Sequence, residues 1–359
     1  MKIYKLAFLP LLLLPFASYV ALEFSASSPG TDSLQIQKSN TAGVTNIVFK
    51  STDGGQTWQD ISKGLPENLR KDGIRGDSIF ANDKGLFLKV GNELYHSTTN
   101  ATAPFWTKEN FPDVHNSIAP DKSGIFANNH WALNLKNSNG TSVWSPIFDV
   151  RSPIFENFHE PRIRIVFETA VGAIFIGTDR GFFKSADSGK TWRHVHAGSL
   201  VGHLAESDGI LLAISTRRII KSTDNGENWE FVTSHNSVAW DVKPIKGGFV
   251  AITASSESGK RSLMTSYDAG KTWQPIAAGD KVFSDSIWRI WNDRPRAQAF
   301  MTPISQIGEN FICTHPHGIF RSSDKGKTWK LLLPAVKDKV FNLFGSGKVI
   351  YAIPSKGGC

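Results

Sequence analysis

Apolar residues of this 359-residue chain lie in short runs that are separated by segments rich in glycine and aspartate. Residues 163–195 show the pattern, with runs at 163–168, 173–177, 181–184 and 191–195. Short runs bounded by turn-forming residues predict β-strands, and long stretches with helical periodicity are absent. We therefore expect a unit of four consecutive β-strands in this part of the chain.

A single motif follows the third predicted strand of this unit, and it recurs along the chain. It reads Ser-x-Asp-x-Gly-x-Thr-Trp, with Asn for Thr in one copy, at residues 51–58, 185–192, 222–229, 266–273 and 322–329. Degenerate copies at 96–106 and 136–144 bring the number of units to seven. The first and last copies start at 51 and 322, so the mean period is (322 − 51)/6, about 45 residues, which suits a four-stranded propeller blade.

The motif, which we call the box, has a structural explanation as the hairpin turn between the third and fourth strands. Its Ser and Asp side chains can hydrogen-bond nearby backbone amides, Gly adopts a conformation that a Cβ atom would oppose, and Trp packs on the blade. We expect these residues to be structural and not catalytic. The box aspartates are Asp53, Asp187, Asp224, Asp268 and Asp324.

The two ends of the repeat region complete each other. Residues 44–60 supply a third and a fourth strand without a preceding pair, and residues 340–343 and 349–353 supply a first and a second strand without a following pair. Sharing one blade between the ends removes exposed sheet edges and closes the ring. The sequence therefore predicts an all-β, seven-bladed β-propeller that is closed by its N- and C-terminal strands.

On these boxes the chain resembles the Asp-box (BNR) repeat propellers over about residues 44–354. The resemblance implies the fold. It does not choose an activity, because this repeat occurs in sialidases, xyloglucan-acting glycosidases, sortilin-type receptors and photosystem II assembly factors.

The two cysteines fall near the predicted closure of the ring. Cys313 lies on the second strand of the last complete blade, and Cys359 lies just past the final strand. A disulfide between them would reinforce the closure, and the alternative is a buried thiol and a separate terminal thiol.

The N-terminus has the form of an export signal. Lys2 and Lys5 precede an apolar run that is short for a membrane-spanning helix. We expect a signal peptide at 1–26, an extension at 27–43 and one propeller domain at 44–359, in a secreted or periplasmic protein with no membrane span after cleavage. The alternative is an uncleaved anchor.

The charge balance points to anionic partners. Forty Lys and Arg residues against 32 Asp and Glu residues give a formal net charge of +8. No Lys/Arg-rich run or nucleic-acid motif is present, so we expect no nucleic-acid partner. We also expect no cofactor and no metal, because phosphate-binding and nucleotide-binding motifs are absent and His315 and His317 lack a third ligand.

Candidate ligand-binding residues lie in the loops expected on the rim opposite the boxes. Arginine offers a planar fork for carboxylates, and tryptophan offers a flat face to a sugar ring or a peptide. The alternative is solvated surface arginines with tryptophans packed under a loop. The candidates are Arg70, Arg75, Arg162, Arg217, Arg218, Trp288, Arg289, Trp291, Arg294 and Arg296.

Two classes of function follow. The first is a monomeric binding or assembly platform for an acidic protein segment or an anionic glycan, the mode that the resemblance to photosystem II assembly factors implies. The alternative is a glycoside hydrolase, either sialidase-like or with two carboxylates.

The sialidase pattern is incomplete in this chain. An Arg-Ile-Pro motif before the first box is missing, and Tyr95, Tyr267 and Tyr351 fall in predicted strands or in a box. Catalytic residues are therefore not assigned. The loop carboxylates open to a two-carboxylate mechanism are Glu67, Asp72, Asp77, Glu156, Glu160, Asp285 and Asp293.

Overall fold

The structure of this chain is a computed structural model. It describes residues 47–67, 69, 74, 78–82, 84–91, 93–110, 117–121, 124–128, 131–137, 144–151, 162–198, 200–233, 237–257, 261–276, 304–315, 318–334, 340–346 and 348–355. All of these belong to one compact unit. The expected signal peptide and N-terminal extension lie outside the described residues and stay predictions.

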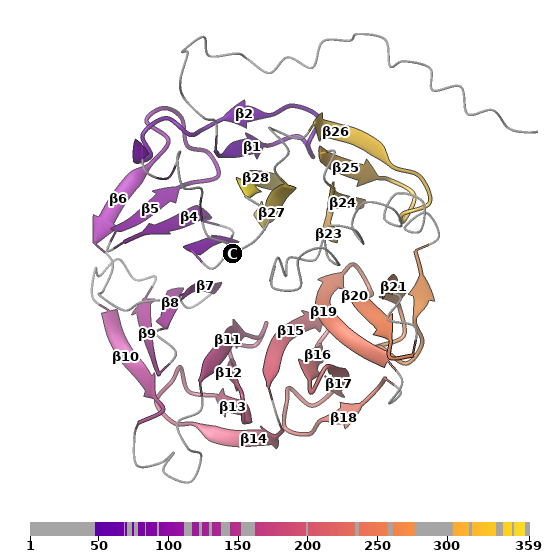
Figure 1. Cartoon of the computed structure of the whole chain (residues 1–359). Helices are drawn as coiled ribbons and strands as arrows, with labels where there is room; N and C mark the ends of the chain where they lie inside the picture. Colours follow the sequence, from indigo (N-terminus) through magenta and orange to yellow (C-terminus); the bar gives the residue numbers. More distant parts are fainter. Residues whose placement is uncertain are drawn as a thin grey trace, which may run out of the picture. The chain divides into compact units, whose positions relative to one another are not determined.

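The described strands form seven four-stranded antiparallel sheets, which we number as blades along the chain (Figure 1). The first blade holds β3 (Ile79–Asn82), β4 (Gly85–Val90), β5 (Glu93–Ser97) and β6 (Thr107–Asn110). The second holds β7 (Ser117–Asp121), β8 (Gly124–Asn128), β9 (Ala132–Asn137) and β10 (Trp144–Asp149). The third holds β11 (Ile163–Glu168), β12 (Ile174–Thr178), β13 (Gly181–Ser185) and β14 (Arg193–Ala197).

The remaining blades follow the same order of strands. The fourth holds β15 (Val201–Ser207), β16 (Ile210–Ser215), β17 (Arg218–Ser222) and β18 (Glu230–Phe231). The fifth holds β19 (Ser237–Ile245), β20 (Gly248–Ser255), β21 (Arg261–Ser266) and β22 (Gln274–Pro275). The sixth holds β23 (Ile304–Ile307), β24 (Asn310–His315), β25 (Gly318–Ser322) and β26 (Lys330–Pro334). The seventh holds β27 (Val340–Ser346), β28 (Val349–Ser355), β1 (Phe49–Ser51) and β2 (Gln59–Asp60).

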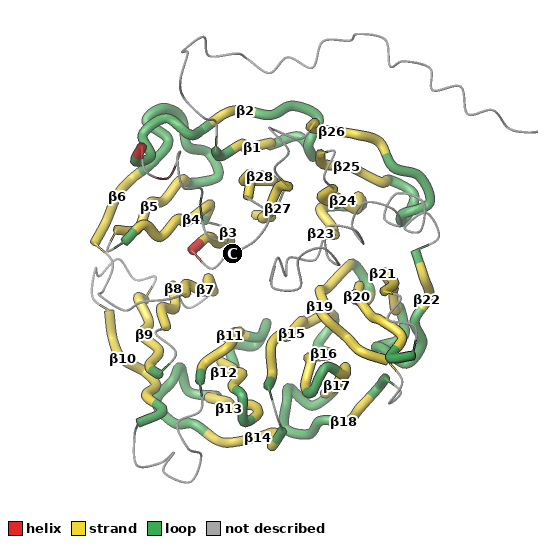
Figure 2. The backbone as a smooth tube through the Cα atoms, in the orientation of Figure 1, coloured by secondary structure: helices red, strands yellow, loops and turns green. Residues whose placement is uncertain are grey.

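The blades form a closed ring, as the sequence predicts. The first strand of each blade is the innermost (Figures 1 and 2), and it contacts the first strand of the next blade in the cycle β3, β7, β11, β15, β19, β23, β27 and back to β3. In the seventh blade, β1 pairs with β28 through Phe49 and Ala352, and through Lys50 and Tyr351. The prediction of a blade shared by the chain ends is confirmed.

The apolar core lies between consecutive blades. Each of the seven clusters of buried side chains in the described residues joins two neighbouring blades. Between the third and fourth blades, for example, Phe175 and Phe182 pack with Val201 and Leu211. Strands covered on both faces read as continuous apolar runs, which explains why every residue of β12 is buried.

The box forms the hairpin turn between the third and fourth strands, as predicted. In the third blade, Asp187 accepts hydrogen bonds from the Thr191 hydroxyl (2.6 Å), the Thr191 N–H (2.8 Å) and the Ser185 hydroxyl (2.8 Å). These bonds, led by that from the Thr191 hydroxyl, lower the pKa of Asp187 to about 2. Because Thr191 belongs to the turn, β14 begins at Arg193 and not at 191.

The box glycine has a second role that the sequence does not reveal. Gly226 has φ +80°, and a Cβ atom there would lie 2.3 Å from the ring of Phe175 on the third blade. In each of the five clear boxes the same glycine faces an apolar side chain of the preceding blade, namely Leu332, Ile147, Phe175, Leu212 and Ile276 for Gly55, Gly189, Gly226, Gly270 and Gly326. The box thus joins neighbouring blades as well as shaping its own turn.

Candidate functional site

The antiparallel order of strands gives each blade two ends. One end carries the boxes and the turns between first and second strands, and we call it the box rim. The opposite end carries the turns between second and third strands and the connections between blades, and we call it the connection rim. Binding sites usually use loops on a rigid scaffold, so the connection rim is the candidate site.

Arg217 occupies a strained position on the connection rim. It forms the turn between β16 and β17 with Thr216, and both residues have positive φ, 61° and 52°. Such two-residue hairpins favour Gly or Asn, so two bulky residues here store backbone strain. The Arg217 carbonyl accepts a hydrogen bond from the Ala239 N–H (2.6 Å), and its guanidinium carbon lies 5.4 Å from the ring centre of Trp240. Arg217 therefore connects the fourth blade to the fifth.

Arg162 has a similar arrangement on the third blade. Its N–H donates to Asp179 (2.9 Å), and its guanidinium carbon lies 5.6 Å from the ring centre of Trp131. Arg151, which follows β10, differs because its guanidinium makes two hydrogen bonds to the Asp149 carboxylate, at 2.7 and 2.9 Å. The Arg162 guanidinium has no carboxylate partner among the described residues, whereas Arg151 is neutralised by Asp149.

The other arginines of this region also differ in whether their guanidinium groups are used within the chain. Arg218 donates to the Thr233 carbonyl (2.7 Å) and lies 4.0 Å from the ring centre of Phe231, so its role is to pack the fourth blade. Arg164 and Arg180 are exposed. Among the described residues neither has a carboxylate partner, so both add positive charge to the connection rim of the third blade.

A polar group below this rim was missed by the sequence reasoning. His203 of β15 and Asp241 of β19 lie between the fourth and fifth blades, with His203 Nδ1 2.9 Å from Asp241 Oδ1. Asp241 is only 4% exposed. Lys243 lies two residues further along β19, and burial lowers its pKa while the Asp241 charge opposes that shift. The alternation of polar and apolar residues along one strand could not predict this pair, because the two residues come from different blades.

Trp131 and Trp240 were also missed, although a count would have found them. The chain has 11 tryptophans and seven boxes that each end in one, so 11 − 7 = 4 lie elsewhere. Trp288 and Trp291 of these four were predicted as site residues, and the other two are the ones that the structure places beneath arginines.

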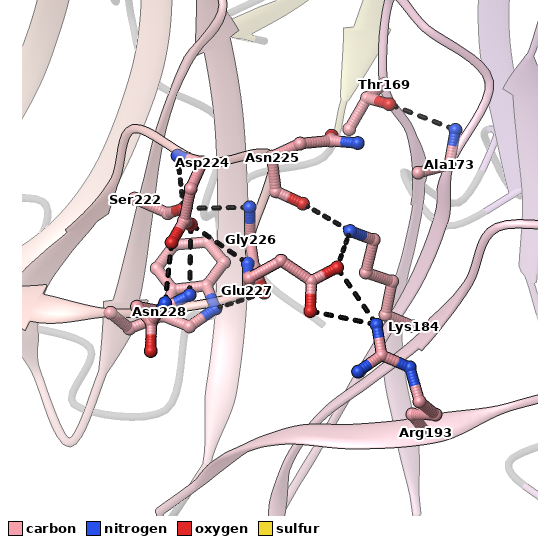
Figure 3. A network of polar contacts seen from close by, with 11 residues as sticks. Thr169, Ala173, Lys184, Arg193, Ser222, Asp224, Asn225, Gly226, Glu227 and Asn228 are labelled. Carbon is pink, nitrogen blue, oxygen red and sulfur yellow. Dashed lines mark hydrogen bonds and ion pairs between the residues drawn. The ribbon is translucent and has the colours of Figure 1, made fainter.

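Three cations at the box-rim ends of the third and fourth blades pair with carboxylates. Figure 3 shows buried Lys184 of the third blade donating to the Asn225 carbonyl (2.7 Å) and to Glu227 (2.5 Å) in the box of the fourth blade. Arg193 adds two bonds to the same carboxylate, at 2.8 and 2.9 Å. Hydrogen bonds from Lys184 and then Arg193 lower the pKa of Glu227. Lys221 likewise pairs with Glu230 at 2.7 Å.

Several predicted site residues lie outside the described part of the chain. They are Arg70, Arg75, Trp288, Arg289, Trp291, Arg294 and Arg296. Cys359 lies there too, so the predicted disulfide stays a prediction. Cys313 on β24 is a buried free thiol, and burial raises its pKa.

Raised pKa values make the three described tyrosines poor nucleophiles. Burial, and a hydrogen bond donated to Glu93, raise the pKa of Tyr95 to about 12. Burial raises the pKa of Tyr351 to about 12 as well. Tyr267 lies in a box, with Lys325 5.1 Å from its ring centre. Of the seven loop carboxylates, the structure describes only Glu67, which is exposed.

Two further properties concern the described residues alone. They contain no group of three or more His, Cys, Asp or Glu side chains arranged to hold a metal ion. None of their helices is long and apolar enough to cross a membrane.

Comparison with known proteins agrees with this architecture. The profile of the BNR/Asp-box repeat family matches residues 49–60. The extracellular domain of the one component system BT4673 from B. thetaiotaomicron is similar over 77% of this chain and 36% of that one, with 15% identity and TM-score 0.51. The GH74 xyloglucanase from Xanthomonas campestris is similar over 84% of this chain and 53% of that one, with 15% identity and TM-score 0.52.

A curated relative covers less of the chain. The UPF0756 membrane protein of Geobacillus sp. (strain WCH70) is 26% identical over 118 residues, which are 33% of this chain and 66% of that protein. The chain thus spans just under two thirds of this relative and about a third to a half of the two similar structures. At these identities the structural likeness establishes the fold, and the chain is a seven-bladed β-propeller with BNR/Asp-box repeats.

Proposed function

We propose that this chain is an exported binding platform whose connection rim docks an acidic segment of another protein. The arginines over tryptophan rings on the connection rim support the proposal. Arg162 and Arg217 lie over tryptophan rings and have no carboxylate partner among the described residues, unlike Lys184, Arg193 and Lys221, which pair with Glu227 and Glu230. Guanidinium groups without a carboxylate partner keep their paired donors free for an incoming carboxylate.

A protein ligand fits this rim better than a glycan does. Sugar rings bind to proteins by lying on open aromatic faces. Trp131 and Trp240 each have an arginine over one face, which leaves less aromatic surface for a sugar ring. The group offered to a ligand at these positions is then the guanidinium. An extended acidic segment needs only a row of cations, which Arg162, Arg180 and Arg217 supply along two neighbouring blades.

Export is supported by two observations. The N-terminal sequence has the lysines and apolar run of a signal peptide. An extracellular domain shares the fold. Mass spectrometry of the mature protein tests this part: a new N-terminus near residue 27 supports cleavage, and an intact Met1 supports the anchor.

Titration of the full chain with a fluorescent peptide of alternating Glu and Gly tests the docking function. We expect micromolar or tighter binding that weakens with salt, and a loss of about tenfold in affinity for Arg217→Ala or Arg162→Ala. The matched control is Lys190→Ala, which removes an exposed cation from the box rim. Equal binding by all three variants would overturn the proposal.

A panel of fluorogenic glycosides distinguishes the platform from the hydrolase. Turnover that survives stringent purification, and is lost on changing a loop carboxylate such as Glu67, would replace the platform by a glycosidase. Tighter binding of polygalacturonate than of the acidic peptide would instead identify the ligand as a glycan.

A further inference from the structure

Three consecutive inner strands share an irregularity that the other four inner strands lack in their described residues. In β11, β15 and β19 the pairing with the second strand skips one residue near the connection rim. The inner strands β3, β7, β23 and β27 pair without such a shift in their described residues. Bulges that add one residue re-aim side chains and are enriched beside active sites. The added residues are Arg164, Gly202 and Trp240.

These three residues occupy equivalent positions on strands that contact one another. Arg164 is exposed, and Trp240 is half-buried with Arg217 against its ring. A Cβ atom on Gly202, the central residue, would meet nothing within 4 Å. A missing side chain between two large ones leaves a notch at the inner edge of the connection rim.

The His203 and Asp241 pair lies directly beside this notch, since each follows an added residue in the chain. Asp241 is buried and its Oδ1 lies 2.9 Å from His203 Nδ1, but neither of its oxygens has a partner in hydrogen-bond geometry in the described structure. The buried carboxylate thus makes a close charge contact with one ring nitrogen of His203, and the other ring nitrogen has no polar contact among the described residues. The half-exposed ring therefore keeps Nε2 for a ligand.

We propose that the Gly202 notch receives a single carboxylate of the docked segment, which accepts hydrogen bonds from the guanidinium groups of Arg164 and Arg217 and from the Nε2–H of His203 as an imidazolium. The inference rests on the proposed docking function and names its specificity-determining site. A carboxylate suits the notch because two oxygens in one plane match the guanidinium fork. The buried Asp241 carboxylate contacts His203 and not the arginines, so Arg164 and Arg217 can bind the carboxylate of the ligand.

Filling the notch without changing the charge tests the inference. Gly202→Leu is compared with Gly345→Leu, because Gly345 is an exposed glycine at the box-rim end of inner strand β27 and its Cβ would make only an ordinary contact, 3.8 Å from Ile307. In the Glu/Gly peptide titration of the full chain, we expect Gly202→Leu to lose about tenfold in affinity and Gly345→Leu to stay within about twofold of wild type.

Additional variants keep the test decisive. Should Gly202→Leu fail to fold, Arg164→Met and His203→Gln replace it, each with an expected loss of about fivefold or more. Wild-type affinity in Gly202→Leu together with weakened binding in Arg217→Ala would overturn the carboxylate site at the notch and still support docking at the connection rim. Wild-type affinity in both would overturn the notch and the docking function together.

Discussion

The contact between box and preceding blade predicts the stability of a matched set of glycine variants. Gly226→Ala places a methyl group 2.3 Å from one ring atom of Phe175 and 2.6 Å from another. Phe175 is fully buried between the third and fourth blades and has no room to move aside. We expect Gly226→Ala to destabilise the protein strongly.

The loss of unfolding free energy in Gly226→Ala has two parts, and a control variant separates them. Positive φ at an alanine costs about 1–2 kcal/mol, and overpacking a filled core costs about 1–3 kcal/mol more. Gly209 has nearly the same φ, +77° against +80°, but a Cβ there meets nothing within 4 Å. Gly209→Ala therefore has only the first part, and Gly226→Ala has both, about 2–5 kcal/mol in total.

Urea unfolding of the two variants and wild type, followed by tryptophan fluorescence, measures the difference. Gly270→Ala adds an intermediate case, because its methyl group would lie 3.3 Å from Leu212. We expect Gly209→Ala to have the highest free energy of unfolding of the three variants, Gly270→Ala an intermediate one and Gly226→Ala the lowest. Equal stability of Gly226→Ala and Gly209→Ala would refute the packing of the box on the preceding blade.

Three further predictions concern the described part of the ring. Glu227→Ala leaves buried Lys184 without its carboxylate, and because Glu227 is partly exposed we expect a loss of only about 1–2 kcal/mol in urea unfolding, with Glu230→Ala as the milder comparison. The pKa of Asp187 is lowered from 3.8 to about 2, so its hydrogen bonds stabilise the fold fully above pH 4 and are lost as the pH falls from 4 to 2; urea midpoints that do not fall over this range would contradict the box geometry. Buried Cys313 is expected to react with a thiol reagent only after unfolding, and rapid labelling of Cys313 in the native protein would contradict its place in the core.

The repeat made the fold predictable to a degree unusual for a single sequence. Each box combines a turn, a positive-φ glycine and a packing tryptophan, and all of these are local properties that short-range rules describe. The strand limits in the third blade differ from the prediction by no more than two residues, for example β14 at Arg193–Ala197 against 191–195. Where the prediction differed, Thr191 belonged to the turn instead of the strand.

The site was less predictable because it depends on contacts between blades. His203 and Asp241 are separated by 38 residues in the chain and meet only because β15 and β19 are neighbours in the ring. Arg217 and Arg218 are adjacent in the sequence, yet one lies over Trp240 on the rim and the other packs on Phe231. The sequence placed both in one loop, and only the left-handed turn at Arg217 separates their roles.

The most direct test of the docking account is hydrogen exchange of the full chain with and without a saturating Glu/Gly peptide. We predict slower exchange in fragments that cover the turns at 178–181 and 215–218, and unchanged exchange in fragments that cover the box at 222–229. Protection confined to the box, or none at either rim despite saturation, would contradict the assignment of the connection rim as the binding surface.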